Sequence, residues 1–228
     1  EENSFDYLAS GNSQQIAATG NYAGVLLNGK LNIYDLTEPR KIGDVTASIS
    51  QLAANDYADT FAGFTGTTLN YWWIENGEIK SGLQTLTNTI TAIKQIPQTQ
   101  NYILTTTKNT VIVGISATGT YSLVSTSDTE LPLTHPQATT IGVVIGVHAP
   151  NEIYIVGADG STAGTYQTGA ALNDASITKA TGLYAITGGN DQQAYILSKD
   201  QSSTWILAQT IKANGAISHT QISTTGGY

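Results

Sequence analysis

The sequence predicts an all-β fold assembled from repeated four-strand units, and three observations support this prediction. β-branched residues and glycines are dense along the chain, and no long stretch keeps the apolar period of 3.6 residues that an amphipathic helix needs. Turn residues recur about every 8 to 12 residues, as in proteins made of short strands. The apolar runs between the turns repeat with a period of about 40 to 45 residues, which is typical of the four-stranded blades of a β-propeller. We expect one propeller domain over residues 1–228, with about five blades.

The clearest unit runs from Gln14 to Val45 and contains four apolar runs separated by turn residues. Its second and third runs, Val25–Leu27 and Leu31–Ile33, are joined by Asn28-Gly29, and Asn-Gly between apolar runs is the strongest short signal for a two-residue hairpin. The unit is therefore predicted to be a meander of adjacent antiparallel strands.

Four further units follow the same order of runs. The second has its own Asn-Gly turn at Asn76-Gly77, and its third strand carries adjacent tryptophans. The continuous apolar inner runs and the polar fourth runs are expected if the blades stack on both faces and expose only their outer strands. The four units span Ile49–Leu86, Ile90–Ser125, Ile141–Tyr166 and Leu183–Leu207.

Two terminal segments, Phe5–Ala9 and Ala216–Ser223, alternate in the period-two manner of strands. We expect them to pair and close the ring, because closure removes the exposed sheet edge of an open array. Alternatively, they belong to a sixth blade. A β-sandwich is the rival fold, since it also consists of short strands with regular turns.

Composition limits the classes of partner. The net charge is -8, charged residues make up 11% of the chain, and the nine basic residues form no cluster, so nucleic acid is not expected as a partner. There is no Cys, which excludes disulfides and thiolate metal sites. No apolar run reaches the roughly 18 residues of a membrane span.

The same composition favours a location outside the cytosol, because Thr, Ser, Asn, Gln and Gly take the polar positions that Lys and Glu normally occupy. The chain begins at Glu1 and not with Met. We therefore expect the mature form of an extracellular or cell-surface protein whose signal peptide has been removed, or an excised fragment.

The stretch Asn21–Val45 resembles the repeats of the extracellular β-propeller families called LVIVD or YVTN-type. The match covers this one unit, and the other units share only its rhythm. The resemblance implies a surface or periplasmic protein with an interaction or structural role, and it brings no catalytic residues. The residues that carry it are Tyr22-Ala23, Leu31, Ile33-Tyr34-Asp35-Leu36, Pro39 and Ile42-Gly43.

We expect no catalytic residue, metal or cofactor. The acid pairs Asp56/Asp59 and Asp128/Glu130 fall in polar loops, where carboxylates normally cap turns and keep the surface solvated. The three histidines, His135, His148 and His219, are far apart in sequence and lack metal-ligand spacing. No Gly-x-Ser-x-Gly string is present for a serine nucleophile.

The tryptophans Trp72, Trp73 and Trp205 are the candidate ligand-contact residues. Adjacent strand residues point to opposite faces, so Trp72 and Trp73 each pack against a different neighbouring blade in one interpretation. In the other, an exposed indole with nearby amides contacts a sugar or a protein.

These observations predict a secreted or cell-surface, non-catalytic propeller that acts as an interaction or structural subunit, for example in a surface layer or filament. Its expected partners are other protein subunits, including copies of itself, or surface glycans. A carbohydrate-binding, lectin-like propeller is the main alternative, and a glycosidase with two carboxylates in the central channel is a third.

Overall fold

The computed structural model describes residues 15–127, 133–140, 143–148, 150–157, 161–178, 181–200, 202 and 204–223. These residues contain 20 strands, arranged as five four-stranded antiparallel sheets with no helix among them. In each sheet the strands follow one another in chain order, so every sheet is a meander.

The sheets follow one another along the chain. Sheet A contains β1 (Gln15–Ala18), β2 (Tyr22–Leu27), β3 (Lys30–Asp35) and β4 (Arg40–Thr46). Sheet B contains β5 (Gln51–Asn55), β6 (Thr60–Thr65), β7 (Thr68–Glu75) and β8 (Glu78–Thr85). Sheet C contains β9 (Ile90–Gln95), β10 (Asn101–Thr106), β11 (Thr110–Ile115) and β12 (Tyr121–Thr126). Sheet D contains β13 (Thr134–Ala138), β14 (Val144–Val147), β15 (Glu152–Val156) and β16 (Thr162–Gln167). Sheet E contains β17 (Leu172–Ile177), β18 (Tyr184–Gly189), β19 (Gln193–Lys199) and β20 (Trp205–Lys212).

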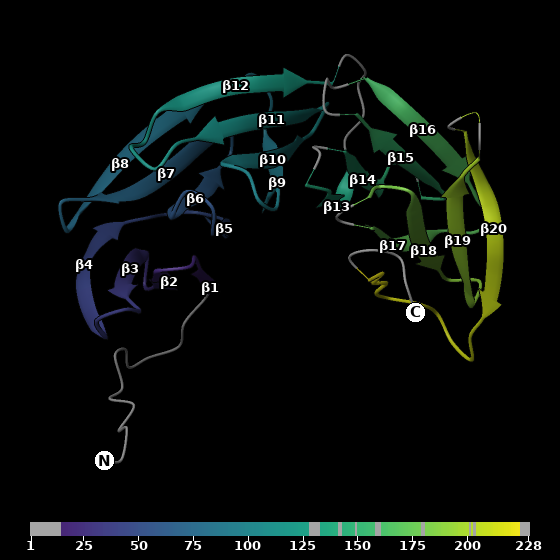
Figure 1. Cartoon of the computed structure of the whole chain (residues 1–228), viewed down its shortest axis with the longest axis horizontal. Coiled ribbons are helices and arrows are strands. Elements are labelled where there is room, and N and C mark those ends of the chain that lie inside the picture. Colours follow the sequence, from purple (N-terminus) through teal and green to yellow (C-terminus); the bar gives the residue numbers. More distant parts are fainter. Residues whose placement is uncertain are drawn as a thin grey trace.

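The five sheets are the blades of a propeller. Figure 1 shows them side by side along an arc, with the first strand of each sheet toward the centre and the fourth strand on the outside. This confirms the predicted β-propeller of five four-stranded units. The sandwich alternative is not observed, because the sheets pack in series around a centre and not as two layers.

Both predicted Asn-Gly hairpins are confirmed. The turn residues Asn28 and Gly29 between β2 and β3 have φ values of 50° and 72°, and Asn76 and Gly77 between β7 and β8 have values of 53° and 74°. Positive φ at both central residues is what a tight hairpin turn requires, and Asn and Gly are the residues that adopt it at least cost.

Apolar side chains from facing sheets form the cores between blades. Phe61 and Trp72 of sheet B pack with Leu31 and Ile33 of sheet A, whereas Tyr71 of sheet B faces sheet C. Alternate residues of one strand thus serve two different interfaces, as the pleat of a β-strand dictates. This is why the inner strands read as continuous apolar runs.

A buried hydrogen bond crosses the core between sheets B and C. Tyr102 of β10 is fully buried, its hydroxyl donates to the carbonyl oxygen of Thr60 on β6 at 2.9 Å, and it lies 3.0 Å from the Thr60 hydroxyl. Burial raises the pKa of Tyr102 above its ordinary value. The hydroxyl is satisfied in the core, so the bond fixes sheet C against sheet B.

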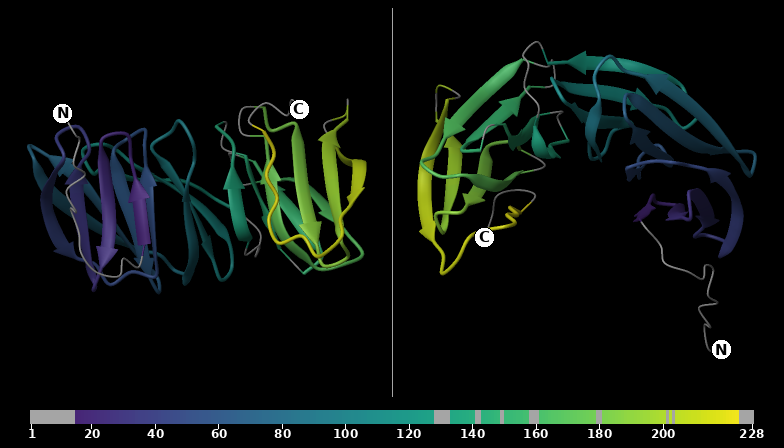
Figure 2. Two further views of the ribbon diagram at one scale, coloured as in Figure 1. Left: turned by 90° about the horizontal axis from the view of Figure 1, so that it is seen from below. Right: turned by 180° about the vertical axis from the view of Figure 1, so that it is seen from behind.

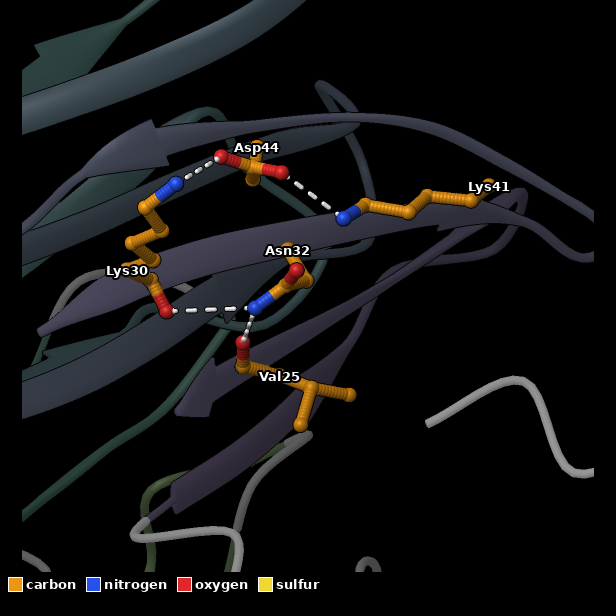
Figure 3. A network of polar contacts seen from close by, with 5 residues as sticks. All are labelled: Val25, Lys30, Asn32, Lys41 and Asp44. Carbon is orange, nitrogen blue, oxygen red and sulfur yellow. Dashed lines mark hydrogen bonds and ion pairs between the residues drawn. The ribbon is translucent and has the colours of Figure 1, made fainter. Parts of the chain in front are cut away.

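Sheet A lies at one end of the arc in the described part of the chain (Figure 1), and its third and fourth strands carry ion pairs. Asp44 lies between Lys30 and Lys41 and accepts from them at 3.0 and 2.7 Å (Figure 3). Below them, the amide nitrogen of Asn32 donates to the carbonyl oxygens of Val25 and Lys30. The bonds from the two lysines hold the pKa of Asp44 below its ordinary value.

The arc is open between sheets A and E in the described part of the chain (Figures 1 and 2). The predicted strand at Ala216–Ser223 forms no ladder with another strand; instead it lies against sheet E, where the Ile217 amide donates to the Gly189 carbonyl oxygen at 3.0 Å. Its predicted partner, Phe5–Ala9, lies outside the described residues, as do Asp128 and Glu130. The described residues include no helix long and apolar enough to cross a membrane.

Alkaline pH is expected to destabilise this fold through Tyr195 of β19. Its hydroxyl donates to the Asp191 carboxylate, and this bond together with burial raises the pKa of Tyr195 to about 12. An unfolded tyrosine has a pKa of about 10. In the folded state Tyr195 therefore stays protonated to a higher pH than in the unfolded state. The stabilisation from its hydrogen bond is complete below about pH 10 and is lost as pH rises toward 12.

The measurement is urea unfolding at several pH values between 8 and 11.5. Tyr195→Phe should show a shallower loss of stability above pH 10 than the wild type, and the exposed Tyr57→Phe should follow the wild type. Equal slopes for Tyr195→Phe and the wild type would contradict the assignment.

Candidate functional site

The three candidate tryptophans lie between blades. Trp72 is 3% exposed in the core between sheets A and B, and Trp205 is 6% exposed in the core between sheets D and E. Trp73 is partly buried between sheets B and C. These positions favour the packing interpretation, and ligand contact by the three rings remains an untested prediction.

Trp73 belongs to a row of aromatic rings between sheets B and C. Tyr71 stacks on Trp73 with ring centroids 6.1 Å apart, and Tyr71 also stacks on Tyr121 with ring centroids 6.4 Å apart. Burial raises the pKa of Tyr121. Gly119, in the turn before β12, lies against the face of the Trp73 indole. The row fixes the position of the outer strand of sheet C relative to sheet B.

A groove lies beside this row, between sheets B and C. We call it the B–C groove. Its volume is about 220 Å³, and it is formed by the end of β8, the segment between β8 and β9, the turn between β10 and β11, and β12. Its lining residues are Gln84, Thr85, Leu86, Thr87, Asn88, Thr106, Asn109, Val111, Tyr121, Leu123 and Thr126.

The lining of the B–C groove is apolar in its interior and polar along its rim. Val111 is buried, whereas Leu123 is 60% exposed although its cross-strand partner on β11, Val113, is fully buried. On the rim, the Asn88 amide donates to the side-chain oxygen of Asn109 at 3.4 Å, and the Asn109 backbone amide donates to the Thr106 hydroxyl at 2.9 Å. These bonds hold the rim in place before any ligand arrives.

None of the residues that line the B–C groove is charged. Its lining holds no carboxylate, imidazole or amine, and its one titratable side chain is that of Tyr121, whose pKa is raised by burial. What it can do is bury an apolar group and offer hydrogen-bond donors and acceptors to a neutral polar chain.

A second hollow of about 540 Å³, the inner hollow, lies on the central side of the arc. Its lining includes one carboxylate, that of Asp174, which accepts from the Thr220 amide at 2.9 Å and lies 3.9 Å from Nδ1 of His219. A glycosidase needs two carboxyl groups about 5 to 10 Å apart. Asp174 instead holds the segment that follows sheet E.

The predicted loop acids that fall within the described residues connect neighbouring sheets. Asp59 accepts from the Asn21 side chain at 2.7 Å, and Asp56 accepts from the side chain of Gln95. Both bonds cross from sheet B to an adjacent sheet, so the acids do more than keep the surface solvated. In the part of the chain that the structure describes, no group of three His, Asp or Glu side chains is placed to hold a metal ion.

The B–C groove was not predicted from the sequence. Its apolar residues belong to runs that the repeat pattern assigns to ordinary strands, and its rim residues belong to ordinary turns. A weak signal was available: Leu123 and Val124 are adjacent apolar residues on a fourth strand. Trp205-Ile206-Leu207 on the fourth strand of sheet E share this feature, so the signal is not specific to the groove.

The fold defines the chain as a β-propeller repeat protein. No protein-family model matches it, and no curated protein matches it in sequence. The predicted resemblance to the LVIVD and YVTN-type families therefore remains a prediction.

Solved structures share the fold at low sequence identity. The β-propeller domain of Cps50 (Swd1) from Myceliophteria thermophila is 11% identical, with a TM-score of 0.61 over 91% of this chain and 74% of that one. Sqt1 from Chaetomium thermophilum, bound to the N-terminus of the ribosomal protein L10, is 12% identical, with a TM-score of 0.69 over 90% of this chain and 64% of that one. A chain of the Mitotic Checkpoint Complex is 14% identical, with a TM-score of 0.60 over 92% of this chain and 69% of that one.

Proposed function

We propose that this protein is a non-catalytic interaction propeller that binds an extended protein segment in the B–C groove. The observation that carries the proposal is the exposed Leu123 beside an uncharged groove with a prearranged amide and hydroxyl rim. Because single exposed apolar side chains are common on protein surfaces, the support comes from Leu123 together with Leu86, Val111 and Tyr121 in the lining of one groove.

The size of the groove suits one anchoring side chain. Sites for whole small molecules usually measure about 300 to 1,000 Å³, and the B–C groove is smaller, at about 220 Å³. Covering a leucine-sized group stabilises a complex by about 1.5 to 3 kcal/mol. The rim amides can then bond to the backbone of the segment on either side of the anchor.

A protein segment fits this lining better than a sugar does. Carbohydrate sites depend on an accessible aromatic face, whereas Tyr121 is half-buried and stacked on Tyr71. The fold neighbour Sqt1, whose structure holds the N-terminus of another protein, supports the proposal by analogy.

We further propose an extracellular or cell-surface location, with assembly into a larger structure. The support is compositional: 11% charged residues leave a surface of hydroxyl and amide groups, which lose less free energy than ionised groups when an interface desolvates them. Size-exclusion chromatography and negative-stain microscopy at high concentration test the assembly, and a strict monomer would remove it.

Leu123→Asp is expected to weaken binding of a groove ligand by about tenfold to a hundredfold, because it replaces an apolar contact with a charge. The probe is a set of peptides selected on the wild-type protein from a random display library, with affinities measured by fluorescence anisotropy. Val124→Asp is the matched control, since Val124 is 49% exposed on the same strand but does not line the groove.

Two results would overturn the proposal. One is a selection that yields no peptide whose affinity depends on Leu123. The other is a glycan array that yields a sugar whose binding depends on Leu123, which would favour the lectin-like alternative.

A further inference from the structure

The outer edge of sheet B differs from the outer edges of the other four sheets. In sheets A, C, D and E, the fourth strand shifts register against the third strand, as it does at a β-bulge. In sheet B, β8 pairs with β7 along all eight of its residues without a shift. Bulges and charged side chains are common means by which proteins keep a sheet edge from pairing with another strand. The edge of β8 lacks the first of these protections.

The second half of β8 lacks charged side chains as well. Glu78 and Lys80, near the start of the strand, form an ion pair at 2.6 Å. The residues that follow, 81–85, read SGLQT and carry no charge. This half of the strand is therefore a regular and uncharged sheet edge, and it ends at the B–C groove.

The main-chain groups of alternate residues point outward from this edge. Just after β8, the Leu86 amide donates to the carbonyl oxygen of Thr67 at 2.9 Å. Directly bonded pairs alternate along an antiparallel ladder, so Gln84 and Gly82 also bond to β7. Between them, Leu83 directs its N–H and C=O groups away from sheet B, and Ser81 does the same.

The side chains of Leu83 and Gln84 lie on opposite faces of sheet B. Gln84 is the cross-strand partner of Leu69, which packs in the core between sheets B and C, and Gln84 lines the B–C groove. Leu83 lies on the other face, with Ile79, which packs in the core between sheets A and B. A strand added along β8 would direct successive side chains alternately into the groove and over Leu83.

Such a strand would cover the two most exposed leucines among the described residues. Leu83 is 65% exposed and Leu123 is 60% exposed. A residue opposite Leu83 would cover the Leu83 side chain, and the next residue, opposite Gln84, would enter the groove that Leu123 lines. Both β8 and β12 lie on the outside of the arc (Figure 1).

We infer that the segment bound in the B–C groove adds to the edge of β8 as an antiparallel fifth strand of sheet B, and that it carries two adjacent apolar residues. The inference rests on the proposed function, because it concerns the same bound segment. The antiparallel direction matches every other strand pair of the sheet. Main-chain bonds to Ser81 and Leu83 supply affinity, and the two apolar side chains supply specificity, as in strand addition to other sheet edges.

A second copy of this chain fits the edge less well than a segment of another protein. If β8 of one copy paired with β8 of another, residues 81–85 would supply the added strand. These residues contain one large apolar side chain, that of Leu83. They cannot cover Leu83 and also place an apolar anchor in the B–C groove.

The test uses the peptides selected on the wild-type protein, each resynthesised with one N-methyl group at every position in turn. Methylation at the residue opposite Leu83 removes a donor to β8 and should weaken binding at least about tenfold. The groove anchor directs its N–H group away from β8, so methylation there should change the affinity less than about threefold. Fluorescence anisotropy measures both, and hydrogen exchange followed by NMR should show slower exchange of the Ser81 and Leu83 amides in the complex.

Leu83→Asp should weaken binding of the same peptides at least about tenfold. Leu207→Asp is the matched control, because Leu207 is 43% exposed on the fourth strand of sheet E, whose edge is bulged. It should bind the peptides like the wild type.

Three results would overturn the inference. Peptides that depend on Leu123 but not on Leu83, with no alternation under N-methylation, would exclude strand addition and leave the proposed function standing. A selection without any Leu123-dependent peptide would overturn both. A dimer that Leu83→Asp dissociates would show that a second copy occupies the edge.

Discussion

Trp72→Ala is expected to lower the free energy of unfolding by about 3 to 5 kcal/mol, the usual range for removing a large buried aromatic ring. The side chain is 3% exposed and packs with Phe61 and Leu31 in the core between sheets A and B. Both neighbours belong to sheets whose backbones are fixed by their own ladders, so the cavity cannot collapse easily. Urea unfolding followed by circular dichroism measures the loss.

Two control variants show whether the loss of stability comes from burial of the Trp72 ring. Trp72→Phe should lose less, because much of the apolar volume remains. Tyr57→Ala, which removes an aromatic ring that is 68% exposed, should change stability by no more than about 0.5 kcal/mol. A Trp72→Ala protein as stable as the wild type would rule out the packing role and restore ligand contact as the role of Trp72.

Gly119→Ala is expected to lower the free energy of unfolding by about 2 to 5 kcal/mol through two effects. The residue has φ of +74°, a conformation in which a Cβ atom costs about 1 to 2 kcal/mol. The added Cβ would also lie 2.5 Å from Cε2 of Trp73, inside the contact distance of a ring held by its stack with Tyr71. Such overpacking adds about 1 to 3 kcal/mol.

Gly29→Ala separates the two effects. Gly29 has nearly the same φ, +72°, but no atom lies within 4 Å of a Cβ there, so only the backbone effect applies. The difference between the two variants, measured by urea unfolding, isolates the contact with Trp73. Equal losses at Gly119 and Gly29 would mean that the indole moves aside freely, and the aromatic row would then not fix the wall of the B–C groove.

The strands and their order could be predicted because they follow from local rules. Asn and Gly adopt positive φ at the lowest cost, so Asn28-Gly29 and Asn76-Gly77 predict tight turns from local sequence alone. The period of the apolar runs likewise predicts the blade repeat. The fourth and fifth predicted units each lacked an innermost strand, β13 and β17. β17 contains the polar residues Asn173, Asp174 and Ser176, which face the segment after sheet E. Their polarity obscures the apolar pattern by which a strand is predicted.

The sites could not be predicted in the same way. A tryptophan on a strand has the same sequence signature whether it meets solvent or a neighbouring blade, and only the packing of whole sheets decides that Trp72 and Trp205 are buried. The B–C groove depends on residues of two sheets that are distant in sequence, such as Gln84 and Leu123, and on how the two sheets pack against each other.

By itself, the sequence determined the all-β class, the four-strand repeat, the hairpin turns and the absence of thiol chemistry, since each depends on residue type and short-range spacing. Only the tertiary structure decided which face of each strand is covered, where a groove stays open and that the arc is open between sheets A and E in the described residues. These features depend on how whole sheets pack against one another, and sheet packing sums many weak contacts between residues that no local pattern connects.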